Sequence, residues 1–559
     1  MRVTGRDPWG DGTAPPSGAV HLAVRDLAVG HPGRPVLRGV TFTAAAGDRV
    51  GLVGENGTGK TTLLHAVAGR LEPTAGQVRL VGTLALVEQD LPLVAGMTVG
   101  DLVEEALGPV RAAARELDEA TAAVDAHQDQ GDAERLAVAL ARAERLGVWD
   151  ADRRVDEALT RFGAPRDTTR PLASLSVGER YRARLACQVA GRADVLLLDE
   201  PTNHLDVGGI DYLTEQVRRW QGAVVVVTHD RRLLDDVMTA IVDLDPSVDG
   251  TPTVYGATDY ATYRYARDQA WRRWQQRYTA ERARRERLAE RLDTSYEGLS
   301  DEWRPPKGSQ KHRRGTRARI HVKAADRLLE QLDANAVEVP PPPVRLVFPD
   351  LPASPAATAA DSPPLLEARG VHVPGRLDLP GVRVQVPPCG RLLVTGPNGS
   401  GKSTLLGVLA GRVPSERGVR STGPGVRVGL LGQDDEVAHD TTRTGFEAYA
   451  AHALRLLEAD ELDPQHLVPV AGLGLLSEDD LERPLRELSV GQRRRFDLAC
   501  ALLAAPHVLV LDEPTNHLSV ALVDDLTEAL RATSAAVVVA THDRALRADL
   551  ADWPNLDLG

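Results

Sequence analysis

The sequence predicts an α/β chain made of two similar halves, separated by a long and strongly basic α-helical hairpin. Four short blocks occur twice, in the same order, along the 559 residues. In each half, strand-length apolar runs are followed by stretches with helical spacing, as expected for α/β domains. The segment between the halves combines helical spacing with an excess of arginine. These three observations set the domain organisation.

The repeated blocks define the two halves as copies of one domain. A glycine-rich block, an LSVG block, an acidic block after an apolar run and a THDR block each return once. The pairs are GENGTGKTTLL (54–64) and GPNGSGKSTLL (396–406), LSVGER (175–180) and LSVGQR (488–493), VLLLDEPTNHLD (195–206) and VLVLDEPTNHLS (508–519), VTHDR (227–231) and ATHDR (540–544).

The first copy contains an insertion. Gln433 follows its counterpart Gln89 by 344 residues, whereas Ser489 follows Ser176 by only 313. The first copy therefore has 31 extra residues between these two points. Residues 100–160 are rich in Ala, Glu, Leu and Arg at helical spacing, which predicts a modest helical insert.

The segment between the copies differs in charge from the rest of the chain. Residues 263–323 hold 18 Lys or Arg and 8 Asp or Glu, a net charge of +10, while the whole chain carries −13. The pattern predicts a helix over about 260–291, a tip containing Pro and Gly at 295–315, and a returning helix to about 332. The prolines at 340–343 and the Ala/Pro/Ser stretch at 350–364 predict an extended connection to the second copy.

Composition narrows the cellular setting. Cys187, Cys389 and Cys500 form no CxxC pair, which favours a reducing compartment. Residues 1–18 lack the apolar core of a secretory signal, and no apolar run approaches the ~20 residues of a membrane span. We therefore expect a cytoplasmic chain without a membrane domain of its own. The expected domains are a disordered tail (1–18), a first nucleotide-binding domain (19–255), a basic helical linker (256–345), a flexible Pro/Ala linker (346–363) and a second nucleotide-binding domain (364–559).

The glycine-rich blocks have the spacing of P-loops. Each follows an apolar run and opens a helix, so its backbone N–H groups can surround phosphate oxygens at a helix N-terminus. Lys60 and Lys402 are expected to contact the β- and γ-phosphates of ATP, and Thr61 and Ser403 to hold Mg²⁺. The predicted ATP-binding residues of the two blocks are Gly54, Asn56, Gly57, Gly59, Lys60, Thr61 and Thr62, with Gly396, Asn398, Gly399, Gly401, Lys402, Ser403 and Thr404.

Acidic residues and histidines supply the expected chemistry. Asp199 and Asp512 end apolar runs, where a carboxylate can reach Mg²⁺. The next residues, Glu200 and Glu513, are suited to polarise the attacking water. In each THDR block a histidine, His229 or His542, follows a valine-rich run and is expected to sense the γ-phosphate.

These blocks resemble the ABC-F family, in which two ABC domains and a helical linker form one chain without a membrane domain. LSVGE and LSVGQ resemble the ABC signature, Gln89 and Gln433 resemble the Q-loop glutamines, and DEPTNHLD is typical of the family. The resemblance implies a head-to-tail sandwich in which Ser489–Gly491 completes the Lys60 site and Ser176–Gly178 completes the Lys402 site. It therefore adds Ser176, Gly178, Ser489, Gly491, Gln89 and Gln433 to the ATP-binding residues, and gives Thr61, Gln89, Asp199, Ser403, Gln433 and Asp512 as the Mg²⁺ set.

Two departures from the family pattern weaken the second site. Ser519 stands where the first copy has Asp206, and the stretch GVHVPGRLDL before the second P-loop lacks an aromatic residue to stack on adenine. We expect both sites to bind ATP and the Lys402 site to hydrolyse it more slowly.

The resemblance implies that the linker acts on the ribosome, near the exit site, with its tip directed to large-subunit rRNA and the P-site tRNA. A +10 hairpin on an acidic chain agrees, since cationic and aromatic side chains bind RNA. The alternative is a solvated spacer whose aromatics pack on the protein, above all Trp271 and Trp274 near the helix base. The residues expected to contact RNA are Trp303, Arg304, Lys307, Lys311, Arg313, Arg314, Arg317 and Arg319.

Within the family, the modest insert and the arginine-rich composition resemble actinobacterial members that protect ribosomes from macrolide, lincosamide or streptogramin antibiotics. A general translation factor is the alternative. An ATPase partner of a separate exporter has no use for a basic aromatic hairpin, and a DNA-repair ATPase would need zinc-binding cysteines, which are absent from the sequence.

Overall fold

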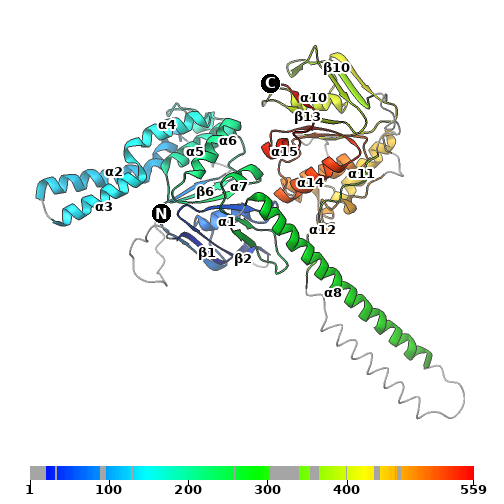
Figure 1. The fold of residues 1–559 in the computed structure, drawn as a ribbon, viewed down its shortest axis with the longest axis horizontal. Helices are drawn as coiled ribbons and strands as arrows, with labels where there is room; N and C mark the ends of the chain where they lie inside the picture. The colour runs from blue at the N-terminus through cyan, green and yellow to red at the C-terminus, as the bar shows by residue number, and fades with distance from the viewer. Residues whose placement is uncertain are drawn as a thin grey trace, which may run out of the picture. The chain divides into compact units, whose positions relative to one another are not determined.

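The structure is a computed structural model. It describes residues 20–31, 34–88, 96–127, 130–256, 259–302, 339–352, 364–397, 399–432, 441–459, 461–462 and 467–559. Two compact units are present. One contains both repeated domains, and the other contains residues 246–251 and 260–343. The ribbon is shown in Figure 1.

The first domain is built on a six-stranded, largely parallel sheet in the order β5-β6-β7-β3-β8-β9. The central strands β6 and β7 read VLLLD and AVVVV, and every residue in them is buried. Such continuous apolar runs are expected when helices cover both faces of a parallel sheet. The bounds are β3 Arg49–Val53, β5 Leu84–Val87, β6 Val195–Asp199, β7 Ala223–Val227, β8 Ala240–Asp243 and β9 Thr253–Gly256.

A three-stranded antiparallel sheet, in the order β2-β1-β4, completes this domain. Alternate residues of its strands, such as Leu22, Val24 and Phe42, are buried in one core with Val225 and Leu197 of the larger sheet. Its strands are β1 Val20–His31, β2 Arg34–Ala45 and β4 Ala75–Leu80.

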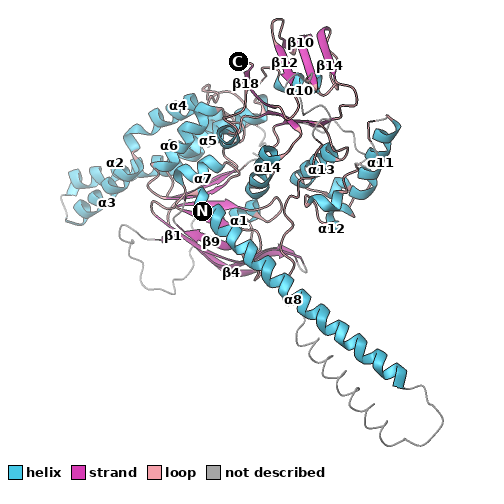
Figure 2. Cartoon of the chain, turned by 45° about the vertical axis from the view of Figure 1, so that its right-hand side comes forward, coloured by secondary structure: helices cyan, strands magenta, loops and turns pink. Residues whose placement is uncertain are grey.

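Two long helices occupy the stretch where the sequence predicts a helical insert in the first copy. Helices α2 and α3 lie side by side in both ribbon views (Figures 1 and 2). Among the described residues of the second copy, the 14-residue helix α11 (Gly445–Glu458) stands in the corresponding place. The helices of the first domain are α1 Lys60–Val67, α2 Val99–His127, α3 Gln130–Leu146, α4 Ala151–Arg161, α5 Val177–Gly191, α6 Val207–Arg218 and α7 Arg231–Val237.

The second domain repeats this architecture with a five-stranded parallel sheet, β15-β16-β17-β13-β18, and an antiparallel sheet in which β10 pairs with β11, β12 and β14. Its strands are β10 Leu366–Val373, β11 Leu377–Asp378, β12 Arg383–Val386, β13 Arg391–Thr395, β14 Arg417–Thr422, β15 Val428–Leu431, β16 Val508–Asp512, β17 Ala536–Ala540 and β18 Asn555–Asp557. Its helices are α10 Lys402–Leu409, α11 Gly445–Glu458, α12 Glu478–Leu481, α13 Val490–Leu502, α14 Val520–Ala532 and α15 Arg544–Asp549.

The start of the connection assigned to a flexible linker belongs to the second domain. The N–H of Val347 donates to the carbonyl of Leu473 at 2.9 Å, and Leu351 is buried in the core of that domain. The expectation of a free linker from residue 346 is therefore wrong for residues 346–352. The reason is local, because the sequence VRLVFPDL supplies apolar side chains that pack on the domain. Residues 353–363 lie outside the described part.

The linker helix begins where the pattern predicted. Helix α8 spans Tyr260–Glu302 and so runs 11 residues past the predicted end at residue 291. An isolated glycine such as Gly298 is tolerated inside a helix, which explains the difference. Arg277–Glu281 and Arg282–Glu286 form ion pairs one turn apart along it. The predicted tip beyond Glu302 and the returning helix lie outside the described residues.

The aromatic residues at the base of α8 have a structural role. The indole N–H of Trp271 donates to the carbonyl of Pro343 at 3.1 Å, and that of Trp274 to Pro340 at 2.8 Å. The proline run is thereby bound along the helix. This outcome agrees with the alternative interpretation for these two residues.

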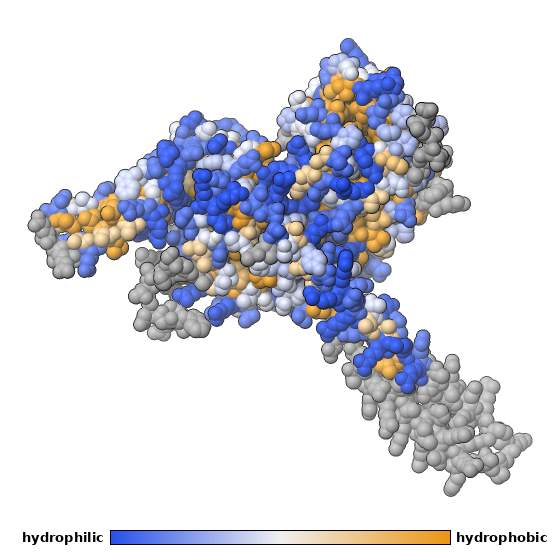
Figure 3. All heavy atoms as spheres, in the orientation of Figure 1, coloured by the Kyte–Doolittle hydropathy of each residue, from blue (hydrophilic) through white to orange (hydrophobic). Residues whose placement is uncertain are grey.

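The surface differs between the helical elements. In Figure 3 the coloured part of α8 is mostly hydrophilic, whereas an apolar band runs along the α2–α3 hairpin, where Val138 and Leu140 are exposed. Within the described part of the chain, no helix combines the length and apolar character needed to cross a membrane.

Candidate ATP sites

The repeated motifs gather at one edge of each parallel sheet. The P-loop follows β3, the acidic pair lies at the end of β6 and the THDR histidine follows β7, and these three strands are neighbours in the sheet. Because the strands are parallel, their carboxyl ends meet at the same edge, where α/β proteins bind ligands. The second domain repeats this arrangement with β13, β16 and β17.

The first P-loop encloses its lysine. Lys60 begins helix α1 and is buried, and its ammonium donates to the carbonyls of Gly54 at 2.7 Å and Glu55 at 3.0 Å. Burial lowers the pKa of Lys60, although nearby carboxylates oppose this effect. Gly59 precedes it with φ of 95°, and a Cβ there would lie 2.8 Å from Leu37, so the loop requires glycine.

The second P-loop has the same construction. Lys402 begins α10, is buried, and donates to the carbonyls of Gly396 at 2.8 Å and Pro397 at 2.9 Å. Gly401 has φ of 94°, matching Gly59. Both lysines therefore lie at the opening of a helix, where their charge adds to the helix N-terminus in attracting phosphate.

The expected Mg²⁺ ligands are brought together. The hydroxyl of Thr61 donates to Asp199 Oδ2 at 2.7 Å. In the second domain a hydrogen bond from Ser403 lowers the pKa of Asp512, but burial has the larger effect and raises it, as burial does for Asp199. Asp512 Oδ1 is buried and has no hydrogen-bond partner in the described structure. Hydroxyl and carboxylate oxygens of this kind fit Mg²⁺, which takes few protein ligands and completes its shell with phosphates and water.

Each glutamate that was expected to be catalytic contacts the histidine of its own domain. Oε1 of Glu200 lies 3.0 Å from His229 Nε2, and Oε1 of Glu513 lies 2.8 Å from His542 Nδ1. Burial raises the pKa of Glu200, but the charge and hydrogen bond of His229 outweigh it, so the net pKa is lowered. Both glutamates have φ of 47°, a conformation uncommon for residues other than glycine and frequent at functional sites.

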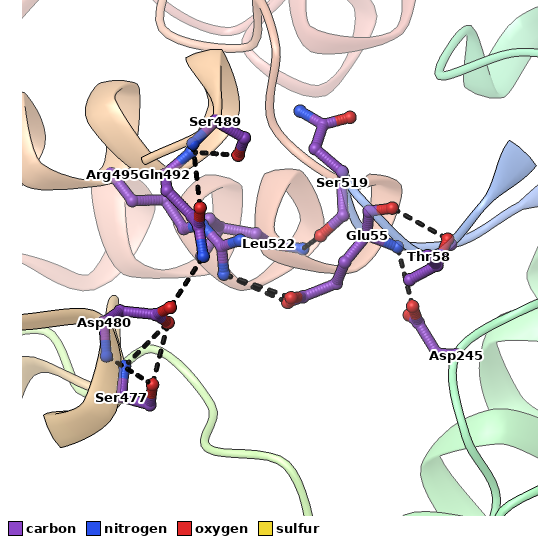
Figure 4. Close-up of polar contacts among 12 residues, drawn as sticks. Glu55, Thr58, Asp245, Ser477, Asp480, Ser489, Gln492, Arg495, Ser519 and Leu522 are labelled. Carbon is purple, nitrogen blue, oxygen red and sulfur yellow. Dashed lines mark hydrogen bonds and ion pairs between the residues drawn. The ribbon is translucent and has the colours of Figure 1, made fainter. Parts of the chain in front are cut away.

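The signature serines cap helices. Ser176 and Ser489 form capping boxes with Glu179 and Gln492, at the starts of α5 and α13. Gly178 and Gly491 lie in the first turns of these helices. Gln492 also donates to Asp480 of α12 at 2.7 Å, which fixes the start of α13 (Figure 4).

One signature motif contacts the opposite P-loop. A Cβ added to Gly491 would lie 2.1 Å from Nδ2 of Asn56, so the two segments touch. That amide also donates to the carbonyl of His517 at 2.5 Å. Gly491 therefore faces the Lys60 site, as the head-to-tail arrangement requires.

The same contacts correct the expectation for Ser519. The sequence comparison of the two copies attached this residue to the Lys402 site, but it lies two positions after His517, whose carbonyl accepts from Asn56 of the first P-loop. The loop that carries Ser519 therefore lies at the Lys60 site, since His517 also interacts electrostatically with Glu200 and His229 of the first domain.

Sequence reasoning missed residues that act through tertiary contacts. Arg494 is buried and donates to the carbonyls of Asp512 and Glu513, and the Tyr181 hydroxyl is 3.5 Å from the carbonyl of Asp199. Arg494 and Tyr181 are 313 residues apart and therefore occupy equivalent positions in the two copies. Comparing the copies at this offset could have drawn attention to them. The predicted residues that lie outside the described part are Gln89, Asn398 and Gln433, together with all the expected RNA contacts from Trp303 to Arg319.

Two P-loops, each with its acidic pair, histidine and signature helix, define a tandem ABC-type ATP-binding protein. The profile described as "ABC transporter" matches residues 37–203 and 379–516. With the internal helical linker and full-length relatives, this places the chain in the ABC-F family of ATPases.

Known relatives extend over nearly the whole chain. The "Tylosin resistance ATP-binding protein TlrC" of Streptomyces fradiae is 38% identical over 551 residues, covering 94% of this chain and 95% of that protein. The "Energy-dependent translational throttle protein EttA" of Mycobacterium tuberculosis is 28% identical, covering 92% of this chain and 87% of its own length. Among solved structures, the archaeal ribosome recycling factor aABCE1, in complex with the stalk protein aP1, covers 93% of this chain and 85% of its own, with a TM-score of 0.53 and 17% identity, and supports the fold.

Proposed function

We propose that this chain is a cytoplasmic ATPase that binds the ribosome in its ATP-bound state and protects it from antibiotics that act on the ribosome. Hydrolysis of ATP to ADP and phosphate would release it. The observation that carries the proposal is the 38% identity over almost the full length to a protein named for tylosin resistance. Macrolides, lincosamides and streptogramins are the drug classes to test.

The chemistry of the sites supports hydrolysis. Mg²⁺, held beside Thr61 and Asp199 or Ser403 and Asp512, would neutralise phosphate charge. Glu200, kept ionised by His229, can accept a hydrogen bond from water and orient it toward the γ-phosphate. Lys60 and Lys402 already lie where the phosphates would bind, and would exchange carbonyl oxygens for phosphate oxygens.

The charge of the linker supports an RNA partner. Residues 263–323 carry +10 in a chain of net charge −13, and cationic side chains bind phosphate by displacing counterions. We propose that residues Trp303 to Arg319 meet large-subunit rRNA and the P-site tRNA, entering near the exit site.

The proposal is tested with a variant that binds ATP without hydrolysing it. Glu200→Gln with Glu513→Gln should co-sediment with ribosomes at low salt in ATP, and the wild type should restore translation in the presence of tylosin. Absence of co-sedimentation would exclude the ribosome as partner.

A general translation factor is the second candidate, favoured by the 28% identity to the translational throttle EttA. Binding to ribosomes with no rescue of translation from any of the three drug classes would favour it. An exporter partner would instead give resistance only in intact cells, with lowered intracellular drug.

A further inference from the structure

The first P-loop is joined to the second domain by an ion pair that has no counterpart in the repeat. Nη1 of Arg495, in α13, lies 3.2 Å from both carboxylate oxygens of Glu55 (Figure 4). Arg495 is mostly buried, with its side chain 14% exposed, and Glu55 is 43% exposed. The pair stands beside the contacts of Asn56 with Gly491 and His517, so it fastens the second signature motif to the first P-loop.

Glu55 is itself fixed within its own domain. Its backbone N–H donates to Asp245 Oδ1 at 2.6 Å, just after β8. The carbonyl of Glu55 in turn accepts from the hydroxyl of Thr58 at 2.9 Å. The carboxylate that meets Arg495 therefore extends from a backbone held on both sides.

The repeat offsets show what replaces this arrangement in the other site. Pro397 stands at the position of Glu55, and Leu558 at that of Asp245. Proline has no N–H to donate, and the side chain of leucine has no acceptor atom. The donor and the acceptor of the hydrogen bond between Glu55 and Asp245 are therefore both missing in the second copy. The carboxylate is missing as well.

The cation at the other site contacts its own domain. Arg182, the counterpart of Arg495, donates to the carbonyls of Gly163 and His204, each at 3.2 Å. Among the described residues, which do not include Asn398, a Cβ added to Gly178 would meet Arg182 first, at 3.3 Å, and then His204, both in the first domain. Gly491, in contrast, would meet Asn56 of the opposite domain.

One other pair of contacts between the domains follows the repeat. Arg231 Nη1 lies 3.0 Å from Asp524 Oδ1, and Arg544 Nη1 lies 2.7 Å from Asp211 Oδ1. Both pairs are related by the 313-residue offset, so this part of the contact is two-fold symmetric. This symmetry does not extend to the P-loops, where Glu55 and Arg495 have no counterpart pair.

We propose that Glu55 and Arg495 are a positioning pair, which holds the second signature motif against the first P-loop before ATP binds, whereas the Lys402 site is assembled only by ATP. The two domains then stay in contact at the Lys60 site with or without ATP. Opening and closing of the sandwich occur at the Lys402 site. The inference rests on the ATPase function proposed above and specifies how its two sites differ.

Hydrogen–deuterium exchange on the full chain tests this without any reporter substitution. In nucleotide-free protein, backbone amides of residues 54–58 and 488–496 should exchange more slowly than the counterpart segments 396–400 and 175–183. ATP with Mg²⁺ should slow exchange chiefly in the counterpart segments. Equal exchange of the two sets without nucleotide would overturn the proposal.

Substitutions separate the ion pair from general packing. Arg495→Gln should speed amide exchange at residues 54–58. The matched control, Arg182→Gln, should leave exchange at 54–58 unchanged. The charge reversal, Glu55→Arg with Arg495→Glu, should restore slow exchange. Arg495→Gln should also raise the KM for ATP about two- to fivefold, the size of effect expected for a partly screened ion pair, with little change in kcat. No change at 54–58 in Arg495→Gln, or the same change in Arg182→Gln, would refute the positioning role.

The exchange measurement needs neither hydrolysis nor ribosomes. Failure of ribosome binding or drug rescue would therefore leave this inference standing, and equal exchange at the two sites would leave the proposed function standing.

Discussion

His229 holds both oxygens of Glu200: its Nε2 lies 3.0 Å from Oε1, and its backbone N–H donates to Oε2 at 3.3 Å. In the second domain His542 contacts Glu513 through Nδ1 and its backbone N–H, and the hydroxyl of Thr541 donates to the same carboxylate at 3.1 Å. The glutamates are thus oriented by the loop after the neighbouring strand, which places a carboxylate beside the P-loop in each domain.

The first prediction concerns hydrolysis. Glu200→Gln with Glu513→Gln removes the carboxylates that orient water while retaining the P-loops and the Mg²⁺ ligands. We expect ATP binding to persist and phosphate release to fall about 100- to 10,000-fold, the range of a general base. Equilibrium nucleotide binding and single-turnover phosphate release measure the two effects. Turnover within a few-fold of the wild type would assign the base to another residue.

The second prediction concerns pH. The hydrogen bond with Glu513 raises the pKa of His542 above its ordinary value of 6.5, although burial opposes it. The folded chain therefore binds this proton more tightly than the unfolded chain. The resulting stability is fully present below the unfolded value and is lost as pH rises through the raised folded value.

His542→Gln should accordingly lower the melting temperature of nucleotide-free protein by about 1–3 °C near pH 6, and by less near pH 9. The expected shift is small because solvent weakens this ion pair. Thermal unfolding across this range measures it. In a Glu513→Gln background the pH-dependent difference should vanish. A difference that grows with pH would contradict the assigned direction.

Much of the fold and of each half-site could be predicted because it is local. A P-loop needs a strand, glycines and a helix in immediate succession, so Lys60 and Thr61 were identified from a few letters. Asp199 and His229 follow neighbouring apolar strands and were found for the same reason. The helical insert was evident from the change in repeat spacing.

What could not be predicted depends on contacts between distant segments. Glu55 and Arg495 are 440 positions apart, and neither stands in a motif that marks it as a partner. The side to which Ser519 belongs also depends on how the domains meet. The end of α8 was missed for a different reason, since Gly298 suggests a turn but a helix tolerates one glycine.

The third prediction concerns the departure at Ser519. Both Asp206 and Ser519 are N-caps, accepting from the N–H groups of Gly209 at 2.8 Å and Leu522 at 3.4 Å. Serine and aspartate cap helices about equally well, so Asp206→Ser should change stability little. Ser519→Ala should cost about 0.5–2 kcal/mol, because the cap is removed. Chemical denaturation compares the two variants. Equal losses of stability would mean that the side chains contribute through something other than capping.

The last prediction concerns the linker and its partner. If Arg313, Arg314, Arg317 and Arg319 contact phosphates, replacing them by Glu should weaken ribosome binding and reduce its dependence on salt, by about one unit of log–log slope for each phosphate that is no longer neutralised. Nucleotide binding should be unchanged, because the P-loops are elsewhere in the chain.

The matched control reverses four exposed arginines of the first domain, Arg135, Arg153, Arg166 and Arg219, with the same change in net charge. A local RNA contact predicts that only the linker variant changes the slope. If both variants weaken binding equally, the ribosome attracts the chain through its overall charge, and the linker is no RNA-binding element. Co-sedimentation of the Glu200→Gln, Glu513→Gln protein at several salt concentrations decides between these outcomes.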